Sequence, residues 1–410
     1  LRMPKWALDP EHKRWMVPFV LVGRWDWGNK ADQDIISILS GQGADVIEHR
    51  INELSNLVDA PLLKEGRLSG VASKLESLRA IAGFVRERDI SEFFQLAEYV
   101  LEEDDPSLDL EKSQRWTAAI HKKLREHSGT IRKSICDTVI LLAVHGPVLL
   151  DGRLNIALTN QVTVLINKLL IDREPRVWLS QQNDLPSYAE AAPEAFLSIV
   201  EDELAKPHAS FDCLFESAEG GLFSRCERTG MLWALELLAW KPDRLGRVIN
   251  ILASLCRYRL DDNWSNKPAG SIRDILLSWY PQTQATVEQR EEVLEALCLS
   301  HPDVGWEFCL SQLGFGGSST SGTYKPKWRD DAVERGVCTY SEKAQFQRKC
   351  MRLMLLRSDY DLEKLKSLIG LLGAIPDEYC SQIENLVMRW LDENPTQAEI
   401  AQLREHVRVN

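Results

Sequence analysis

Apolar residues recur with the spacing of an α-helix along most of the chain. One such stripe, in residues 44–58, comprises Val46, Ile47, Ile51, Leu54 and Val58. Residues three and four apart lie on the same helix face, so this stripe can face a core while the opposite face meets water. Every long periodic segment fits this period better than the period of two that strands show. The pattern therefore predicts an all-α fold of about 17 to 19 helices, without a strand.

Capping residues indicate where several of these helices begin. Asp9, Pro10 and Glu11 are typical of a first helical turn: Asp caps the N-terminus, and proline is tolerated there because its missing N–H is not needed. Thr286 and Gln289 form a capping-box pair. In the first third of the chain we expect a turn-rich link at 23–30, a loop at 59–70, and helices at 68–84 and 113–126.

The stretch from Leu232 to Leu299 contains one phrase twice. The two copies, at residues 237–242 and 276–281, share two leucines, a tryptophan and a proline, and start 39 residues apart. Repeats of helix pairs of the HEAT and armadillo type have periods near this length. The phrase predicts an α-solenoid of stacked antiparallel helix pairs, HEAT- or TPR-like, in which each Trp-x-Pro turn joins two helices. Helix 229–240 has two apolar stripes, so we expect Trp233, with Leu237 and Trp240, to be buried.

Proline, phenylalanine and paired glycines between residues 206 and 221 indicate the main division of the chain. We therefore predict an N-terminal helical subdomain, 1–206, and a C-terminal helical-repeat subdomain, 207–410. One continuous solenoid is the alternative. The Gly/Ser-rich stretch 313–329 predicts a flexible loop that interrupts the array.

Charge and cysteine content narrow the class of protein. The net charge of −12 argues against non-specific binding to nucleic acid, which requires a basic field. The nine cysteines are odd in number and widely spaced, which is typical of neither a disulfide framework nor a zinc site. We expect reduced thiols and a cytoplasmic protein. No apolar run is long enough to span a membrane. Because the chain begins at Leu1, we expect a fragment of a longer protein.

Catalytic motifs are absent from the sequence. It has no G-x-x-x-x-G-K-[ST], no H-E-x-x-H, no G-x-S-x-G and no G-x-G-x-x-G. The eight histidines are scattered, and a lone histidine on a helix is usually structural. We therefore expect no enzyme activity, no catalytic residue, no metal site and no cofactor.

Two loops combine cations with aromatic residues and are the predicted partner-binding surfaces. Long loops on a rigid array are where recognition commonly occurs. The candidates in loop 257–273 are Trp264, Asn266, Lys267 and Arg273. The candidates in the second loop are Tyr324, Lys325, Lys327, Trp328 and Arg329. In the alternative interpretation, Trp264 packs on the array, Asn266 caps a turn, and Trp328 packs its loop back on the core.

Four segments resemble a known class of proteins. They are AEAAPEAFLSIVEDEL (189–204), WALELLAWKPDRLGRVINILASL (233–255), NWSNKPAGSIRDILLSWYPQT (263–283) and YKPKWRD (324–330). They resemble the helical C-terminal regions of bacterial antiviral STAND NTPases of the Avs class, which are NLR-like. The resemblance extends over most of the chain, but the NTPase motifs and any effector domain are absent. No catalytic residue can therefore be carried over.

The resemblance implies a sensor module of an anti-phage defence protein. Such a module would bind a phage structural or packaging protein, such as terminase or portal, and would belong to a larger polypeptide with NTPase and effector modules. A structural or oligomerisation scaffold of helical repeats is the alternative function. A third alternative is an enzyme with an unrecognised all-helical active site.

Overall fold

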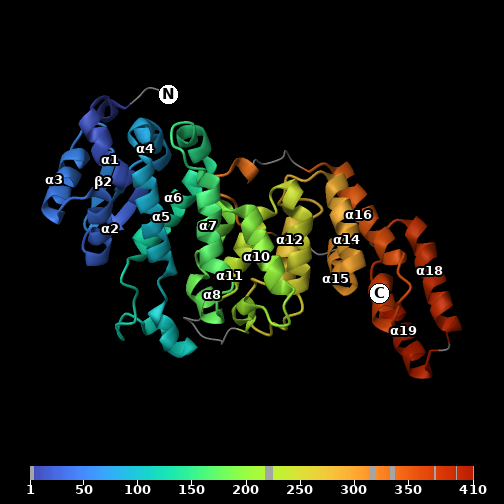
Figure 1. Ribbon diagram of the computed structural model, residues 1–410. Helices are drawn as coiled ribbons and strands as arrows, with labels where there is room; N and C mark the ends of the chain where they lie inside the picture. The colour runs from blue at the N-terminus through green and yellow to red at the C-terminus, as the bar shows by residue number, and fades with distance from the viewer. Residues whose placement is uncertain are drawn as a thin grey trace. The chain divides into compact units, whose positions relative to one another are not determined.

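Helices make up most of the described chain in the computed structural model (Figure 1). The structure describes residues 4–217, 225–313, 320, 322–332, 338–373, 375–393 and 395–409. Within the predicted loop 313–329, residues 314–319 and 321 lie outside this range. The prediction of an all-α protein is confirmed in its broad sense. The prediction that no strand is present is wrong, because the chain also forms a small sheet.

The chain forms two compact units. The first comprises Leu1–Leu237, Tyr258–Trp264 and Pro326–Asp330; the second comprises Leu238–Arg257, Ser265–Lys325 and Asp331–Asn410. The chain therefore returns to the first unit after it has begun the second. The division predicted between residues 206 and 207 stays a prediction.

The first unit contains the sheet and the helices up to α11. Its α-helices are α1 (Pro10–Val22), α2 (Lys30–Ser40), α3 (Ala44–Ser55), α4 (Lys74–Ile81), α5 (Glu87–Glu102), α6 (Gly129–Val144), α7 (Leu158–Leu170), α8 (Pro175–Gln181), α9 (Leu185–Ala191), α10 (Pro193–Leu204) and α11 (Thr229–Leu238). Its short helices are η1 (Lys5–Leu8), η2 (Ala82–Phe84), η3 (Pro106–Asp109), η4 (Lys112–Thr117), η5 (Pro147–Asp151) and η6 (Ser210–Phe215).

Helix α6 is the centre of the first unit. Its side chains are buried on nearly all faces, including Ile131, Ile135, Val139 and Leu142. A helix that is apolar all round is stable only when neighbours surround it. Helices α1, α5, α7 and α9 and strand β1 (Arg24–Asp26) all pack against α6. Figure 1 shows α5, α6 and α7 side by side.

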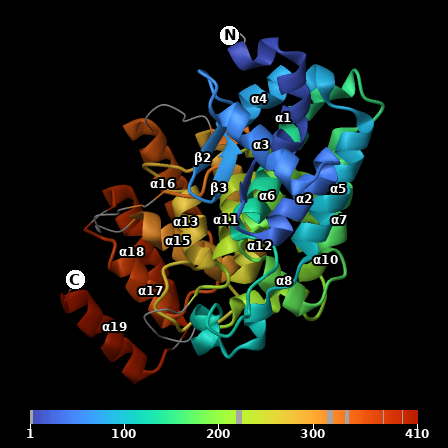
Figure 2. The same cartoon turned by 90° about the vertical axis from the view of Figure 1, so that its left-hand side faces the viewer.

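Three short strands form an antiparallel sheet in the order β1-β3-β2. Strands β2 (Leu62–Glu65) and β3 (Leu68–Val71) form a hairpin, with Gly66 in the left-handed region at φ 61°. Figure 2 shows β2 and β3 beside α1 and α3, which they contact. Three predictions are therefore wrong in part. Strands form within the predicted loop at 59–70 and the predicted link at 23–30, and the helix predicted from residue 68 begins only at Lys74. Strands of three or four residues are too short to show a period of two.

The predicted helix at 113–126 is also wrong. Only the short helix η4 forms at its start, and turns follow to residue 122. Lys122 has φ 54°, in the left-handed region, which a continuing helix cannot include. The amphipathic pattern was present, but the backbone does not follow it.

The second unit consists of helices. They are α12 (Pro242–Leu255), α13 (Pro268–Ile275), α14 (Val287–Ser300), α15 (Pro302–Leu313), α16 (Tyr340–Leu355), α17 (Leu362–Ile369), α18 (Asp377–Asp392) and α19 (Gln397–Val409). A short helix, η7 (Asp330–Ala332), begins where the two units meet in the sequence. Helix α12 packs on α13 and α14, and α14 and α15 pack on each other and on α16. Helix α17 contacts both α18 and α19.

The two copies of the repeated phrase have different structures. The first copy ends α11 and leads directly into α12 at Pro242, as predicted. The second copy begins after α13 has ended at Ile275, and α14 starts only at Val287. Thr286 and Gln289 do cap α14 as predicted, in a capping box. The second Trp-x-Pro sequence is therefore part of a longer connection and not a helix–helix turn.

Candidate protein-binding surface

The connection between α12 and α13 is shorter than the predicted loop 257–273: it ends at Lys267, and Arg273 lies inside α13. The segment Tyr258–Trp264 belongs to the first unit, and the chain enters the second unit again at Ser265. Of the four candidates in this loop, Trp264 therefore lies in the first unit. The other three, Asn266, Lys267 and Arg273, lie in the second.

An ion pair between Arg228 and Asp262 anchors the segment 258–264. Arg228 precedes α11, and its Nη1 and Nη2 donate to the two carboxylate oxygens of Asp262, at 2.8 Å and 2.6 Å. The Arg228 side chain is 0% exposed and that of Asp262 is 3% exposed. Buried charges persist only when they are paired and hydrogen-bonded, and a two-pronged guanidinium–carboxylate contact satisfies both groups.

Three further contacts hold the segment. The ring of Tyr258 stacks on Phe215, with centroids 4.8 Å apart. The Tyr258 hydroxyl donates to the carboxylate of Asp212, and the backbone N–H of Asp261 donates to Ser217 Oγ at 3.2 Å. Side-chain contacts, and not regular secondary structure, thus fix this part of the loop.

Two indole rings are exposed on the elements that this ion pair connects. The N–H of Trp264 donates to Asp262 Oδ1 at 3.1 Å, which fixes its backbone, while its side chain is 38% exposed. Trp233 follows Arg228 by five residues in α11, about 7.5 Å along the helix axis, and is 41% exposed. We call Trp233 and Trp264 the indole pair.

The sequence identified Trp264 but not Trp233. The apolar pattern predicted that Trp233, Leu237 and Trp240 share a buried face; Leu237 and Trp240 are buried, and Trp233 is not. Its neighbours Leu232 and Ala234 are both buried, so α11 exposes one large aromatic ring from an otherwise apolar helix. Only the packing around α11 reveals this, because periodicity does not say which of two apolar faces is covered.

The candidates of this loop in the second unit lie before and within α13: Asn266 and Lys267 precede it, and Arg273 is in its last turn. Lys267 is the capping residue before Pro268, and Asn266 accepts a hydrogen bond from Ser265 Oγ at 3.3 Å. Arg273 is half exposed, and its guanidinium pairs with Asp274 at 3.1 Å. The carboxylate offsets the positive charge of Arg273, so this part of the loop carries little net charge.

The second candidate loop is likewise divided between the units. Tyr324 and Lys325 lie in the second unit, where the ammonium of Lys325 stands over the ring of Trp240, 4.9 Å from its centroid. Trp240 Nε1 donates to the carbonyl oxygen of Tyr324 at 3.2 Å. The Tyr324 side chain remains exposed.

The rest of the loop belongs to the first unit, where Lys327, Trp328 and Arg329 bond to α6 and α9. Lys327 pairs with Asp137 of α6 at 2.7 Å, and Trp328 Nε1 donates to the same carboxylate at 3.4 Å. The buried carboxylate of Glu190 accepts from the N–H groups of Trp328 and Arg329, at 2.5 Å and 3.1 Å. Arg329 Nε donates to the Glu190 carbonyl at 2.6 Å. The polar groups of this segment are thus engaged within its own unit.

Lys74 lies close to the same segment. Its Nζ donates to the carbonyl oxygen of Ser134 at 2.5 Å and to Ser134 Oγ at 3.1 Å. Burial lowers the pKa of Lys74 from its ordinary value of 10.5 to about 7; the nearby Asp137 raises this pKa and Lys327 lowers it. Among the described lysines, Lys74 is the one whose side chain loses its proton near neutral pH.

The described residues contain no group of three or more His, Cys, Asp or Glu that could hold a metal ion. Among the same residues, no helix is long and apolar enough to cross a membrane. No protein-family model, no curated protein and no solved structure matches the chain.

Proposed function

We propose that this chain is a non-catalytic, protein-binding module of a bacterial anti-phage defence protein. It senses a phage structural or packaging protein in the cytoplasm, through the surface of helix pairs stacked as a solenoid. The resemblance of residues 189–204, 233–255, 263–283 and 324–330 to sensor regions of antiviral STAND NTPases supports this proposal. In the full polypeptide, this binding would release an NTPase module to oligomerise and switch on an effector module.

The observation that carries the binding role is the exposure of the indole pair on a fixed support. Tryptophan is enriched among the residues that dominate protein–protein binding energy, because it buries a large area at a low entropy cost. Trp264 is held through the buried ion pair and Trp233 by helix α11, so little further ordering is needed when a partner covers them. Ligand, metal and nucleotide chemistry are not required for this role.

A binding titration with purified phage proteins tests the proposal. The 410-residue chain should bind terminase or portal protein, and Trp233→Ala combined with Trp264→Ala should weaken binding by about 30-fold or more. Trp116→Ala is the matched control, because Trp116 is 54% exposed but lies in η4. It should leave the affinity unchanged.

Two outcomes would contradict the proposal. The first is that the chain binds neither phage protein, and the second is that the double variant and Trp116→Ala bind equally well. A chain that self-associates in light scattering, and loses this on substitution of the indole pair, would instead support the structural or oligomerisation scaffold.

A further inference from the structure

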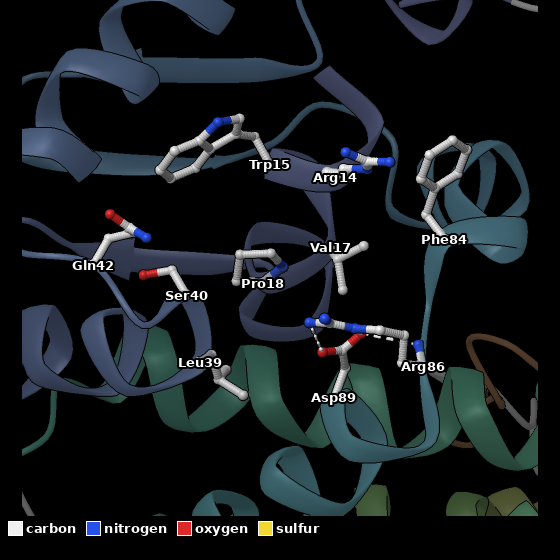
Figure 3. A pocket seen from close by; sticks show the side chains of 10 residues that line it. All are labelled: Arg14, Trp15, Val17, Pro18, Leu39, Ser40, Gln42, Phe84, Arg86 and Asp89. Carbon is white, nitrogen blue, oxygen red and sulfur yellow. Dashed lines mark hydrogen bonds and ion pairs between the residues drawn. The ribbon is translucent and has the colours of Figure 1, made fainter. Parts of the chain in front are cut away.

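A pocket of about 270 Å³ opens in the first unit, away from the segments discussed so far. Helix α1, the C-terminal end of α2, the short helix η2 and the start of α5 enclose it. Figure 3 shows its side chains, with Arg14 drawn between the rings of Trp15 and Phe84. The lining combines aromatic and apolar walls with a few polar groups, which is the usual composition of a small-molecule site.

The walls of the pocket offer flat apolar surfaces. Trp15 and Phe84 supply two aromatic rings, and Val17 and Pro18 of α1 supply apolar atoms. Cations already stand over both rings: the guanidinium of Arg50 is 5.1 Å from Trp15, and the ammonium of Lys13 is 5.5 Å from Phe84. Their contact with the rings holds each aromatic side chain in place. The charge of Arg50 is offset by Glu11 and Glu53, with which it forms ion pairs.

The charges that line the pocket do not balance. Asp89 accepts hydrogen bonds from Arg86 Nε at 3.1 Å and from Nη2 at 2.7 Å, so this carboxylate is engaged by Arg86. The side chain of Arg14 makes no hydrogen bond or ion pair with any described residue. Two guanidinium groups and one carboxylate leave the pocket with a surplus positive charge, in a chain whose net charge is −12.

The backbone of α1 adds a further polar group at the wall. Pro18 lies inside the helix and has no N–H, so it cannot donate to the carbonyl oxygen of Arg14 four residues earlier. A proline inside a helix is costly, by about 3 kcal/mol. Ser40 and Gln42 supply a hydroxyl and an amide at the end of α2. Acceptors and donors are thus available to orient a ligand.

We propose that this pocket binds a small aromatic oxyanion, that is, a flat ring carrying one carboxylate or phosphate group. The oxyanion pairs with Arg14, whose planar guanidinium matches both groups, and the ring lies along Trp15 and Phe84. The volume equals that of about nine water molecules at about 30 Å³ each, which suits a ligand between an indole carboxylate and a nucleoside monophosphate in size. This inference is independent of the protein-binding role.

Calorimetric titration of the whole chain tests the inference and distinguishes the two sources of the anion. Adenosine monophosphate and indole-3-acetate are the probes, with adenosine, indole and inorganic phosphate as partial ligands. We expect one of the two anions to bind with a Kd between about 10 µM and 1 mM, and the partial ligands to bind at least about tenfold more weakly.

Variants locate the site. Arg14→Gln should weaken binding by about tenfold or more, and Phe84→Ala should weaken it while keeping the charge. Arg88→Gln is the matched control, since Arg88 lies in α5 outside the pocket and pairs with Glu92 at 2.6 Å. Thermal melting verifies that each variant is folded. The inference is overturned if neither anion binds at about 5 mM, or if Arg14→Gln and Arg88→Gln bind equally.

Discussion

The guanidinium of Arg228 and the carboxylate of Asp262 form two parallel hydrogen bonds, 2.8 Å and 2.6 Å long, with both side chains removed from water. The residues are 34 positions apart. One precedes α11 and the other lies in a loop without regular structure. This contact fixes the loop that carries Trp264, and therefore determines how one ring of the indole pair is presented.

Removal of the carboxylate should destabilise the protein strongly. Asp262→Ala leaves Arg228 buried without a counterion, so we expect the free energy of unfolding to fall by about 3 to 5 kcal/mol. Asp261→Ala is the control, because the Asp261 side chain is exposed and has no partner among the described residues; it should change the value by less than about 0.5 kcal/mol. Urea unfolding measures both. Equal effects would mean that the ion pair does not hold the loop.

Tryptophans with different exposure should contribute differently to stability. Trp178 is fully buried and lies edge-on to Phe211, with centroids 5.5 Å apart, so Trp178→Ala should cost about 3 to 5 kcal/mol. Trp264→Ala should cost less than about 1 kcal/mol, because the ring is exposed and its backbone contact to Asp262 persists. Denaturant unfolding of both variants measures the difference. A large loss for Trp264→Ala would show that its ring packs as a core residue does.

Glu190 should protect the segment 326–330 from proteolysis. Its carboxylate accepts two backbone N–H groups, and Glu190→Ala leaves them without this acceptor. We expect trypsin to cleave after Lys327 and Arg329 about tenfold faster in this variant. Mass spectrometry of the fragments identifies the sites. Asp202→Ala, on the exposed face of α10, is the control and should leave cleavage unchanged; a similar acceleration in both variants would contradict the prediction.

Lys74 should make stability depend on pH. Its pKa falls from 10.5 to about 7 on folding, because burial disfavours the charged amine. The unfolded chain therefore binds the proton more tightly than the folded chain. Below pH 7, burial of the charged amine lowers the free energy of unfolding by its full amount. This loss disappears as the pH rises from 7 to 10.5.

Lys74→Met tests this dependence, because methionine removes the amine. Urea unfolding measures the free energy of unfolding of both proteins. The value for the variant minus that for the wild type should be larger at about pH 6 than at about pH 9.5. Lys133→Met is the control: Lys133 is exposed on α6, so the difference from the wild type should not vary with pH in this way. A pH-independent effect of Lys74→Met would contradict the assignment.

The local signals of helix ends were readable from the sequence. Asp9 caps α1 by accepting from the N–H of Glu11, and Thr286 caps α14 by accepting from the N–H of Gln289. These features depend on residues within one turn of each other, so short-range chemistry determines them. The existence of most helices follows in the same way from their apolar spacing.

Features that depend on distant residues were not readable. The hairpin β2–β3 is stabilised by pairing with β1, which lies about 40 residues earlier. The phrase at 276–281 shares four of six residues with 237–242, but the helix before it ends earlier and the connection after it is longer. Similar local sequences thus adopt two conformations, because the packing partners differ.

The candidate binding residues show the same limit. Trp264 was identified from its loop, while Trp233 was expected in the core because periodicity does not reveal which apolar face is covered. Conversely, Lys327 and Arg329 looked available for a partner, and the acceptors that engage them, Asp137 and Glu190, are far away in the sequence. Whether these loops bind a partner remains the prediction that the titrations address.

The return of the chain to its first unit has a consequence for inheritance and for dissection. Helix α12 interrupts the sequence between Arg228 and Asp262, so a gene fragment that stops at residue 237 encodes an arginine without its counterion. The two units therefore cannot be exchanged between proteins by a single recombination event. The segments of both units must therefore be inherited together.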